Sequence, residues 1–121
     1  MTRDQHIEKA CQVGAGLNDT RVIVGEWSNA ITDCAKHLNS RGSGARFDGT
    51  FAGSRGFVGD CGPLTGSSGG WSEDYKQYLR KYWETQASAY ETQLGWFFWS
   101  WKTEVGLNSI SSRYTEIFTE C

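Results

Sequence analysis

The sequence predicts an α/β fold with parallel strands, and three observations support this prediction. Helical and strand-like segments alternate along the 121 residues, in the order helix, strand, helix, long loop, helix, strand. The two predicted strands, at 22–25 and 96–102, are apolar runs typical of strands buried on both faces, and neither resembles an edge strand. Two apolar strands cannot enclose a core alone. We therefore expect the chain to be part of a larger structure.

The first predicted helix begins at a capping box formed by Thr2 and Gln5. In such a box the two side chains satisfy each other's backbone N–H groups. Apolar residues then recur at helical spacing as far as Cys11. The glycines at 14 and 16 end the helix.

The strand at 22–25 presents a single carboxylate, Glu26, at its C-terminal end. In enzymes built as barrels of alternating strands and helices, catalytic groups lie at that end of the strands. The alternative is that Glu26 only caps the next helix. The sequence favours such a short helix from Ser28 to Asn39, with Ser28 as its N-cap.

Residues 40–70 form a long loop, because they contain ten of the fifteen glycines and the one proline. Loops of this length inside a domain are usually functional or disordered. Four cysteines allow two disulfides in three connectivities. We favour a Cys34–Cys61 bridge, which would tie this loop down. No Cys-x-x-Cys pair is present, so the cysteine spacing does not fit a zinc site. We expect no metal ion and no cofactor.

The longest predicted helix begins at Ser72, followed by two acids in its first turn. Its apolar and tyrosine residues recur at helical spacing, which favours a packing face over a binding surface. Gly95 ends this helix, and the second strand, at 96–102, follows.

Composition excludes several classes of partner. The net charge is -2 and the basic residues are scattered, so nucleic acid and anionic membranes are not expected partners. No apolar run is long enough to span a bilayer, and residues 2–6 are too polar to open a signal peptide. The six tryptophans would suit sugar binding, although aromatic residues more often fill a core.

Two segments carry a resemblance to a known family. Val-Gly-Glu-Trp-Ser at 24–28 and Gly-Trp-Phe-Phe-Trp-Ser-Trp-Lys-Thr-Glu at 95–104 closely resemble the C-terminal part of fungal exo-1,3-β-glucanases of glycoside hydrolase family 5. Shorter matches lie between them, at 33–36 and 71–72. The resemblance covers 1–104 and implies the last two βα units, strands seven and eight, of a partial (β/α)8 TIM barrel. The tail at 105–121 does not resemble the family.

The resemblance also implies a site and a substrate. Glu26 falls where the family has its catalytic nucleophile, Trp99 where an aromatic ring floors the glucose subsite, and Asn39 at a sugar-contact position. Residues 97, 99 and 101 share one side of a strand, so Trp99 faces a barrel interior only if the other two do. The implied substrate is β-1,3-glucan, and the implied location is extracellular or the cell wall.

The departures from the family point to an incomplete enzyme. Its acid/base glutamate lies in an Asn-Glu-Pro motif, and this chain has no Asn-Glu pair. We therefore expect the chain to be inactive alone, as a truncated reading frame would be. The alternatives are a non-catalytic carbohydrate-binding or interaction module, or a degraded remnant. The family's other disulfide would join Cys11 to a late cysteine, for which Cys121 is the candidate.

Overall fold

The computed structural model describes residues 1–16 and 21–99. They form two compact units, the first combining Met1–Asn29 with residues 72–99 and the second comprising Ala30–Trp71. The last residues of the predicted second strand, at 100–102, and the tail at 105–121 lie outside the described residues.

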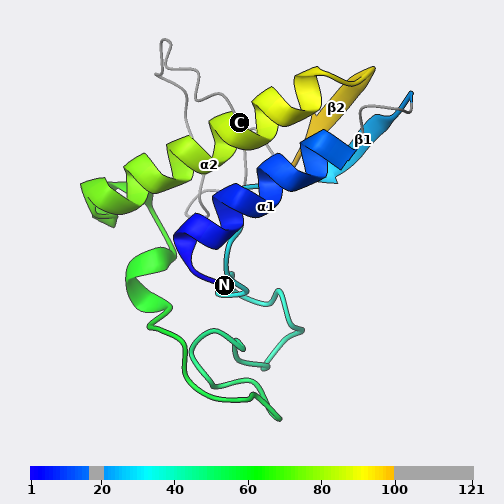
Figure 1. The fold of residues 1–121 in the computed structure, drawn as a ribbon. Coiled ribbons are helices and arrows are strands. Elements are labelled where there is room, and N and C mark those ends of the chain that lie inside the picture. The colour runs from blue at the N-terminus through cyan, green and yellow to red at the C-terminus, as the bar shows by residue number, and fades with distance from the viewer. Residues whose placement is uncertain (17–20, 100–121) are drawn as a thin grey trace. The chain divides into compact units, whose positions relative to one another are not determined.

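The first unit contains two helices and two strands. In chain order these are α1 (Arg3–Gly16), β1 (Ile23–Trp27), α2 (Glu73–Glu91) and β2 (Gly95–Phe98). The two strands pair in parallel, as predicted. Figure 1 shows α1 and α2 side by side, with the two strands at one end of the pair.

The predicted capping box opens α1. The Thr2 backbone N–H donates to Gln5 Oε1 at 2.8 Å, and the Gln5 N–H donates to Thr2 Oγ1 at 3.3 Å. The helix then packs against α2 through its N-terminal half, where the Arg3 guanidinium lies 5.1 Å from the centre of the Tyr78 ring. One turn further on, the rings of His6 and Tyr82 are 5.9 Å apart. Since both contacts advance in the same direction, the two helices run parallel.

Helix α2 begins where the sequence predicted. The Ser72 hydroxyl accepts a hydrogen bond from the Tyr75 N–H at 3.2 Å, and two acids occupy the first turn. The tyrosine pattern forms a packing face, as expected. The buried residues of α2 are Tyr75, Tyr78, Leu79, Thr85, Gln86, Ala87, Ala89 and Tyr90.

Trp27 is the centre of the core between the sheet and α2. It is 8% exposed, and its ring lies 4.8 Å from Phe98, 5.3 Å from Trp96 and 5.3 Å from Tyr90, all near edge-to-face. Edge-to-face pairs add roughly 0.5–1.5 kcal/mol each beyond the area they bury. The aromatic side chains of both strands therefore fix β1 and β2 onto the helix.

A β-bulge interrupts the register between the two strands. Val24 pairs with Trp96 and Glu26 with Phe97, so Gly25 has no counterpart on β2. Without the bulge, two-residue alternation would turn Glu26 toward the same side as Val24. With it, Val24 and Trp27 both contact the core and Glu26 is turned away.

The second unit shows that one predicted helix is wrong. Residues 28–39 contain bends and turns, and two short 3-10 helices, η1 (Gly62–Leu64) and η2 (Ser68–Gly70), follow later in the loop. His37 and Ser40 have φ angles of 68° and 87°, which a right-handed helix does not allow. The hydrogen bonds of Asp33 and the Cys34–Cys61 disulfide override the local helix propensity of this segment. The disulfide itself is present as predicted.

Within the described residues, no helix combines the length and the apolar character that crossing a bilayer requires.

Candidate functional site

Glu26 lies one residue before the C-terminal end of β1, inside the bulge rather than just after the strand. Its side chain is exposed. Among the described residues its carboxylate has neither a hydrogen bond nor an ion pair. The backbone therefore sets the side of the sheet from which the side chain leaves, and no described side chain fixes its torsions.

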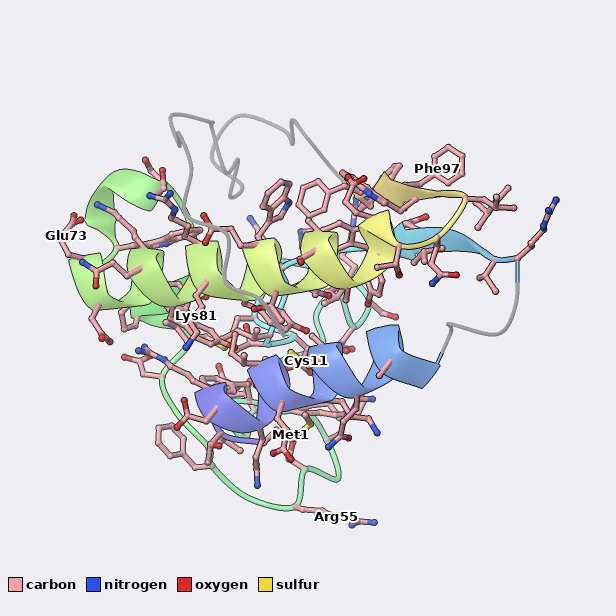
Figure 2. All side chains as sticks on the ribbon, turned by 45° about the horizontal axis from the view of Figure 1, so that its top comes forward. Met1, Cys11, Arg55, Glu73, Lys81 and Phe97 are labelled. Atoms are coloured by element: carbon pink, nitrogen blue, oxygen red, sulfur yellow. A yellow bond between two sulfur atoms is a disulfide. The ribbon has the colours of Figure 1, made fainter. Side chains whose placement is uncertain are left out.

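The strands have one covered and one open face. Val24, Trp96 and Phe98 pack with Trp27 against α2. The opposite face carries Ile23, Glu26, Phe97 and Trp99, with Ile23, Phe97 and Trp99 61%, 66% and 63% exposed. Figure 2 shows the Phe97 ring projecting from the sheet away from the helices. A carboxylate and two large rings therefore share the face that α2 leaves uncovered.

Trp99 lies just beyond β2, yet it is still hydrogen-bonded to β1. Its backbone N–H donates to the Trp27 carbonyl at 2.8 Å, which continues the parallel ladder one step past Phe98. Trp99 is two residues from Phe97, so both side chains leave the same side of the strand. This agrees with the expectation that residues 97 and 99 share one side, whereas Trp101 lies outside the described residues.

Buried amides fasten the chain immediately after Glu26, and the sequence did not indicate them. Asn29 is 7% exposed, and its Nδ2 donates to the Leu79 carbonyl of α2 at 2.9 Å. Gln86, 5% exposed, donates through Nε2 to Asn29 Oδ1 at 3.3 Å. The one available signal was a glutamine at an otherwise apolar position on the packing face of α2.

Asn39, the predicted sugar contact, belongs to the second unit, which is described separately from Glu26 and Trp99. Its Nδ2 donates to Asp33 Oδ2 at 2.8 Å and to the Gly44 carbonyl at 3.1 Å. Its Oδ1 accepts a hydrogen bond from Arg46 Nη1 at 2.9 Å. Asn39 thus has a fixed orientation, with one lone pair of Oδ1 left for a further donor.

Asp33 organises this part of the second unit. Its carboxylate accepts hydrogen bonds from the backbone N–H groups of Arg46 at 2.8 Å and Phe47 at 3.0 Å, as well as from Asn39. Burial alone would raise the pKa of Asp33, but these hydrogen bonds outweigh it and lower the pKa to about 2. The ionised carboxylate therefore holds Asn39 in place at neutral pH.

The second unit also contains an open hollow of about 490 Å³. Polar groups from both sides of the disulfide line it, among them the carboxylates of Asp33 and Asp48 and the Lys36 side chain. The Thr50 backbone N–H and hydroxyl both donate to Asp48 Oδ1, and these bonds lower the pKa of Asp48. The lining is thus charged at neutral pH.

The cysteines of the described region are all oxidised. Cys34 and Cys61 form their bridge across 27 positions, and Cys11 is disulfide-bonded too. Cys121, its expected partner by family resemblance, lies outside the described residues. In the part of the chain that the structure describes, no cluster of three or more His, Cys, Asp or Glu side chains could bind a metal ion.

Comparison with known proteins identifies close relatives. The chain is 46% identical over 108 residues to the protein named "Probable glucan 1,3-beta-glucosidase A" of Aspergillus niger and 44% identical over 110 residues to the protein of the same name from Aspergillus terreus. It is 47% identical over 103 residues to the glucan 1,3-beta-glucosidase of Candida oleophila. These matches cover 86%, 88% and 84% of this chain. No family profile matches the chain.

The relatives are much longer than the matched region. The alignments cover 26% of the two Aspergillus proteins and 24% of the Candida protein. Identity of this level over most of the chain establishes common descent. The chain is therefore a fragment-length homologue of the fungal glucan 1,3-beta-glucosidases, spanning about a quarter of the length of the curated relatives it matches.

Proposed function

We propose that this chain supplies the nucleophile-bearing strand of a retaining exo-1,3-β-glucosidase of glycoside hydrolase family 5, whose complete fold is a (β/α)8 barrel. In this proposal β1 and β2 are strands seven and eight, α2 lies on the outside, and the open sheet face lines the interior. The observation that carries the proposal is the face shared by Glu26, Phe97 and Trp99. A carboxylate and exposed rings on a parallel sheet suit a sugar-binding interior better than a solvent-facing surface.

The chemistry accounts for each residue type. A carboxylate oxygen of Glu26 attacks the anomeric carbon of the terminal glucose, and the glycosidic C–O bond breaks. A second carboxylic acid protonates the departing oxygen and then removes a proton from the water that attacks the glycosyl-enzyme. Retention requires the two carboxyl groups to lie about 5–5.5 Å apart. The second acid must come from another strand, because this chain has no Asn-Glu pair.

Trp99 provides the flat apolar face on which the glucose ring rests. Its exposed ring and its place one step beyond β2 suit this role. Asn39 offers its remaining Oδ1 lone pair to a sugar hydroxyl. The names of the relatives support a β-1,3-glucan as substrate, so we place the complete protein in cell-wall polysaccharide metabolism outside the cell.

On its own the chain is proposed to be inactive. The loss of general acid assistance alone lowers a rate by about 10²–10⁴-fold. Loss of positioning by the other strands lowers it further.

Complementation tests the proposal. The chain, the part of the Aspergillus niger relative that it does not match, and a mixture of both are assayed on laminarin and on an aryl β-glucoside. The proposal predicts turnover in the mixture only, and none when the chain carries Glu26→Gln. Turnover by the chain alone, or a mixture unaffected by Glu26→Gln, would refute it.

A non-catalytic binding module is the rival function, and the exposed rings of Phe97 and Trp99 favour it. Affinity electrophoresis of the chain alone in laminarin gels separates the two. Retardation abolished by Trp99→Ala, together with no turnover in any mixture, would establish the binding module instead.

A further inference from the structure

We infer that Asn29 and Gln86 are positioning residues for Glu26. They form a buried amide bridge, defined here as the hydrogen bonds that join these two side chains to each other, to the Leu79 carbonyl of α2 and to the Ser28 carbonyl. The inference rests on the proposed function, because it assigns these residues to the nucleophile of that reaction.

Glu26 depends on its backbone for its orientation. Its carboxylate is exposed and, among the described residues, unpartnered. It also lies in a bulge, where the ladder between β1 and β2 is irregular. No neighbouring side chain in the described structure therefore holds the carboxylate, and there the position of the Glu26 backbone depends on the segments before and after it.

The amide bridge fastens the segment after Glu26. Asn29 lies three residues further on, and its Nδ2 donates to the Leu79 carbonyl at 2.9 Å. Gln86 Nε2 lies 3.3 Å from Asn29 Oδ1 and 3.4 Å from the carbonyl of Ser28. The bridge thus connects Ser28 and Asn29, which follow β1, to α2, the longest helix of the unit. The contacts on α2 are the Leu79 carbonyl and the Gln86 side chain.

Trp27 also holds the end of β1 against α2, but through ring packing instead of hydrogen bonds. Its ring contacts the Tyr90 and Phe98 rings on different sides. These contacts fix how deeply the Trp27 side chain is buried and how its ring is rotated. The amides add direction, because a hydrogen bond weakens steeply as its geometry departs from linear. Directly after the bulge the backbone ladder holds β1, since the Trp99 N–H donates to the Trp27 carbonyl, and Asn29 and Gln86 fasten the chain beyond that point.

The amides are an unusual choice for this place if they only stabilise the fold. Both side chains are more than nine-tenths buried, and a neighbouring apolar cluster already packs β1 against α2. Apolar residues of similar size can replace a buried polar pair with little loss of stability. In this inference the polar pair serves the geometry of the strand end that bears Glu26.

The test uses the full chain complemented by the unmatched part of the Aspergillus niger relative. A 2-deoxy-2-fluoro glucoside with a good leaving group traps the glycosyl-enzyme. The amplitude of labelling measures the fraction of correctly assembled sites. The first-order rate constant of labelling at saturating reagent measures how well the Glu26 carboxylate is positioned for attack. The variant is Gln86→Leu, and the control is Gln77→Leu, the same change at an exposed position of the same helix.

We expect Gln86→Leu to lower the rate constant about 10–100-fold at every labelled site, since misplacement of a reacting group by about 1 Å costs about this much. Gln77→Leu should leave both amplitude and rate unchanged. A Gln86→Leu chain with reduced amplitude but the wild-type rate constant would show a merely structural role and overturn the inference. The wild-type mixture is measured before the variants. If it is not labelled, the proposed function is rejected, and the inference that rests on it is rejected too.

Asn29→Asp provides a second variant. It keeps an oxygen for Gln86 but removes the donor to the Leu79 carbonyl, so it should lower the same rate constant. A wild-type rate constant for this variant would contradict a role for the Asn29 donor.

Discussion

Asp33→Asn is the substitution whose effect the structure defines most closely. The carboxylate of Asp33 accepts two backbone N–H groups and the Asn39 amide. An amide at position 33 would turn an NH₂ group toward at least one of these donors. Depending on which way that amide turns, either the Phe47 N–H or the pair formed by the Arg46 N–H and the Asn39 amide would lose its acceptor.

The pKa of Asp33 gives the magnitude. Hydrogen bonds lower it from 3.8 to about 2, which corresponds to about 2 kcal/mol of stability at neutral pH. The side chain is 20% exposed, so solvent screening lowers this figure, and about 2 kcal/mol is its upper bound. Because the folded pKa lies below the unfolded one, this stability is complete above pH 3.8 and is lost as the pH falls from 3.8 toward 2.

Hydrogen exchange measures the effect directly. In the complemented chain at neutral pH, Asp33→Asn should make the amide of Arg46 or Phe47, whichever loses its acceptor, exchange up to about 30-fold faster, the equivalent of about 2 kcal/mol. In the wild type, their protection corrected for intrinsic rates should fall between pH 4 and pH 2. The control is Asp60→Asn, an exposed carboxylate of the same unit that accepts the Gly62 N–H. Equal protection in Asp33→Asn and wild type, or wild-type protection that holds at pH 2, would refute this reasoning.

Two further predictions concern the second unit. A Cβ at Gly44 would lie 2.0 Å from Thr50 Oγ1 and 2.6 Å from the Thr50 carbonyl carbon, so Gly44→Ala should destabilise the unit by about 1–3 kcal/mol. Gly70→Ala should not destabilise the unit, because no atom lies within 4 Å of a Cβ at that position. An equal loss of hydrogen-exchange protection in both variants would contradict the steric explanation. Reduction of the Cys34–Cys61 bridge should cost about 3 kcal/mol and open the loop to proteolysis, and a cleavage pattern unchanged by reductant would count against this.

The sequence predicted most of the helices and strands because their signals are local. The capping box at Thr2, the cap at Ser72 and the apolar runs of both strands each fix structure within a few residues. The prediction of a helix at 28–39 is wrong because contacts with residues distant in sequence determine the conformation of that segment. Asp33 bonds to backbone groups 13 and 14 positions away, and Cys34 to a cysteine 27 positions away.

The sequence named the candidate site residues but did not predict their geometry. Family resemblance named Glu26, Trp99 and Asn39, and period-two alternation placed residues 97 and 99 on one side. The bulge that turns Glu26 to that side was missed, although a glycine inside a strand is a known sign of one. The amide bridge joins residues 57 positions apart, and no local pattern reveals such a pairing.

The central claim is that Glu26 is the nucleophile of a shared active site. The most direct measurement is peptide mapping of the complemented chain after trapping with a 2-deoxy-2-fluoro glucoside. We expect one added fluoroglucosyl group, attached to the peptide that contains Glu26 and absent from a Glu26→Gln chain. A label on Glu84, which pairs with Arg80 at 2.7 Å on α2, or on Glu104, would show that Glu26 is not the nucleophile.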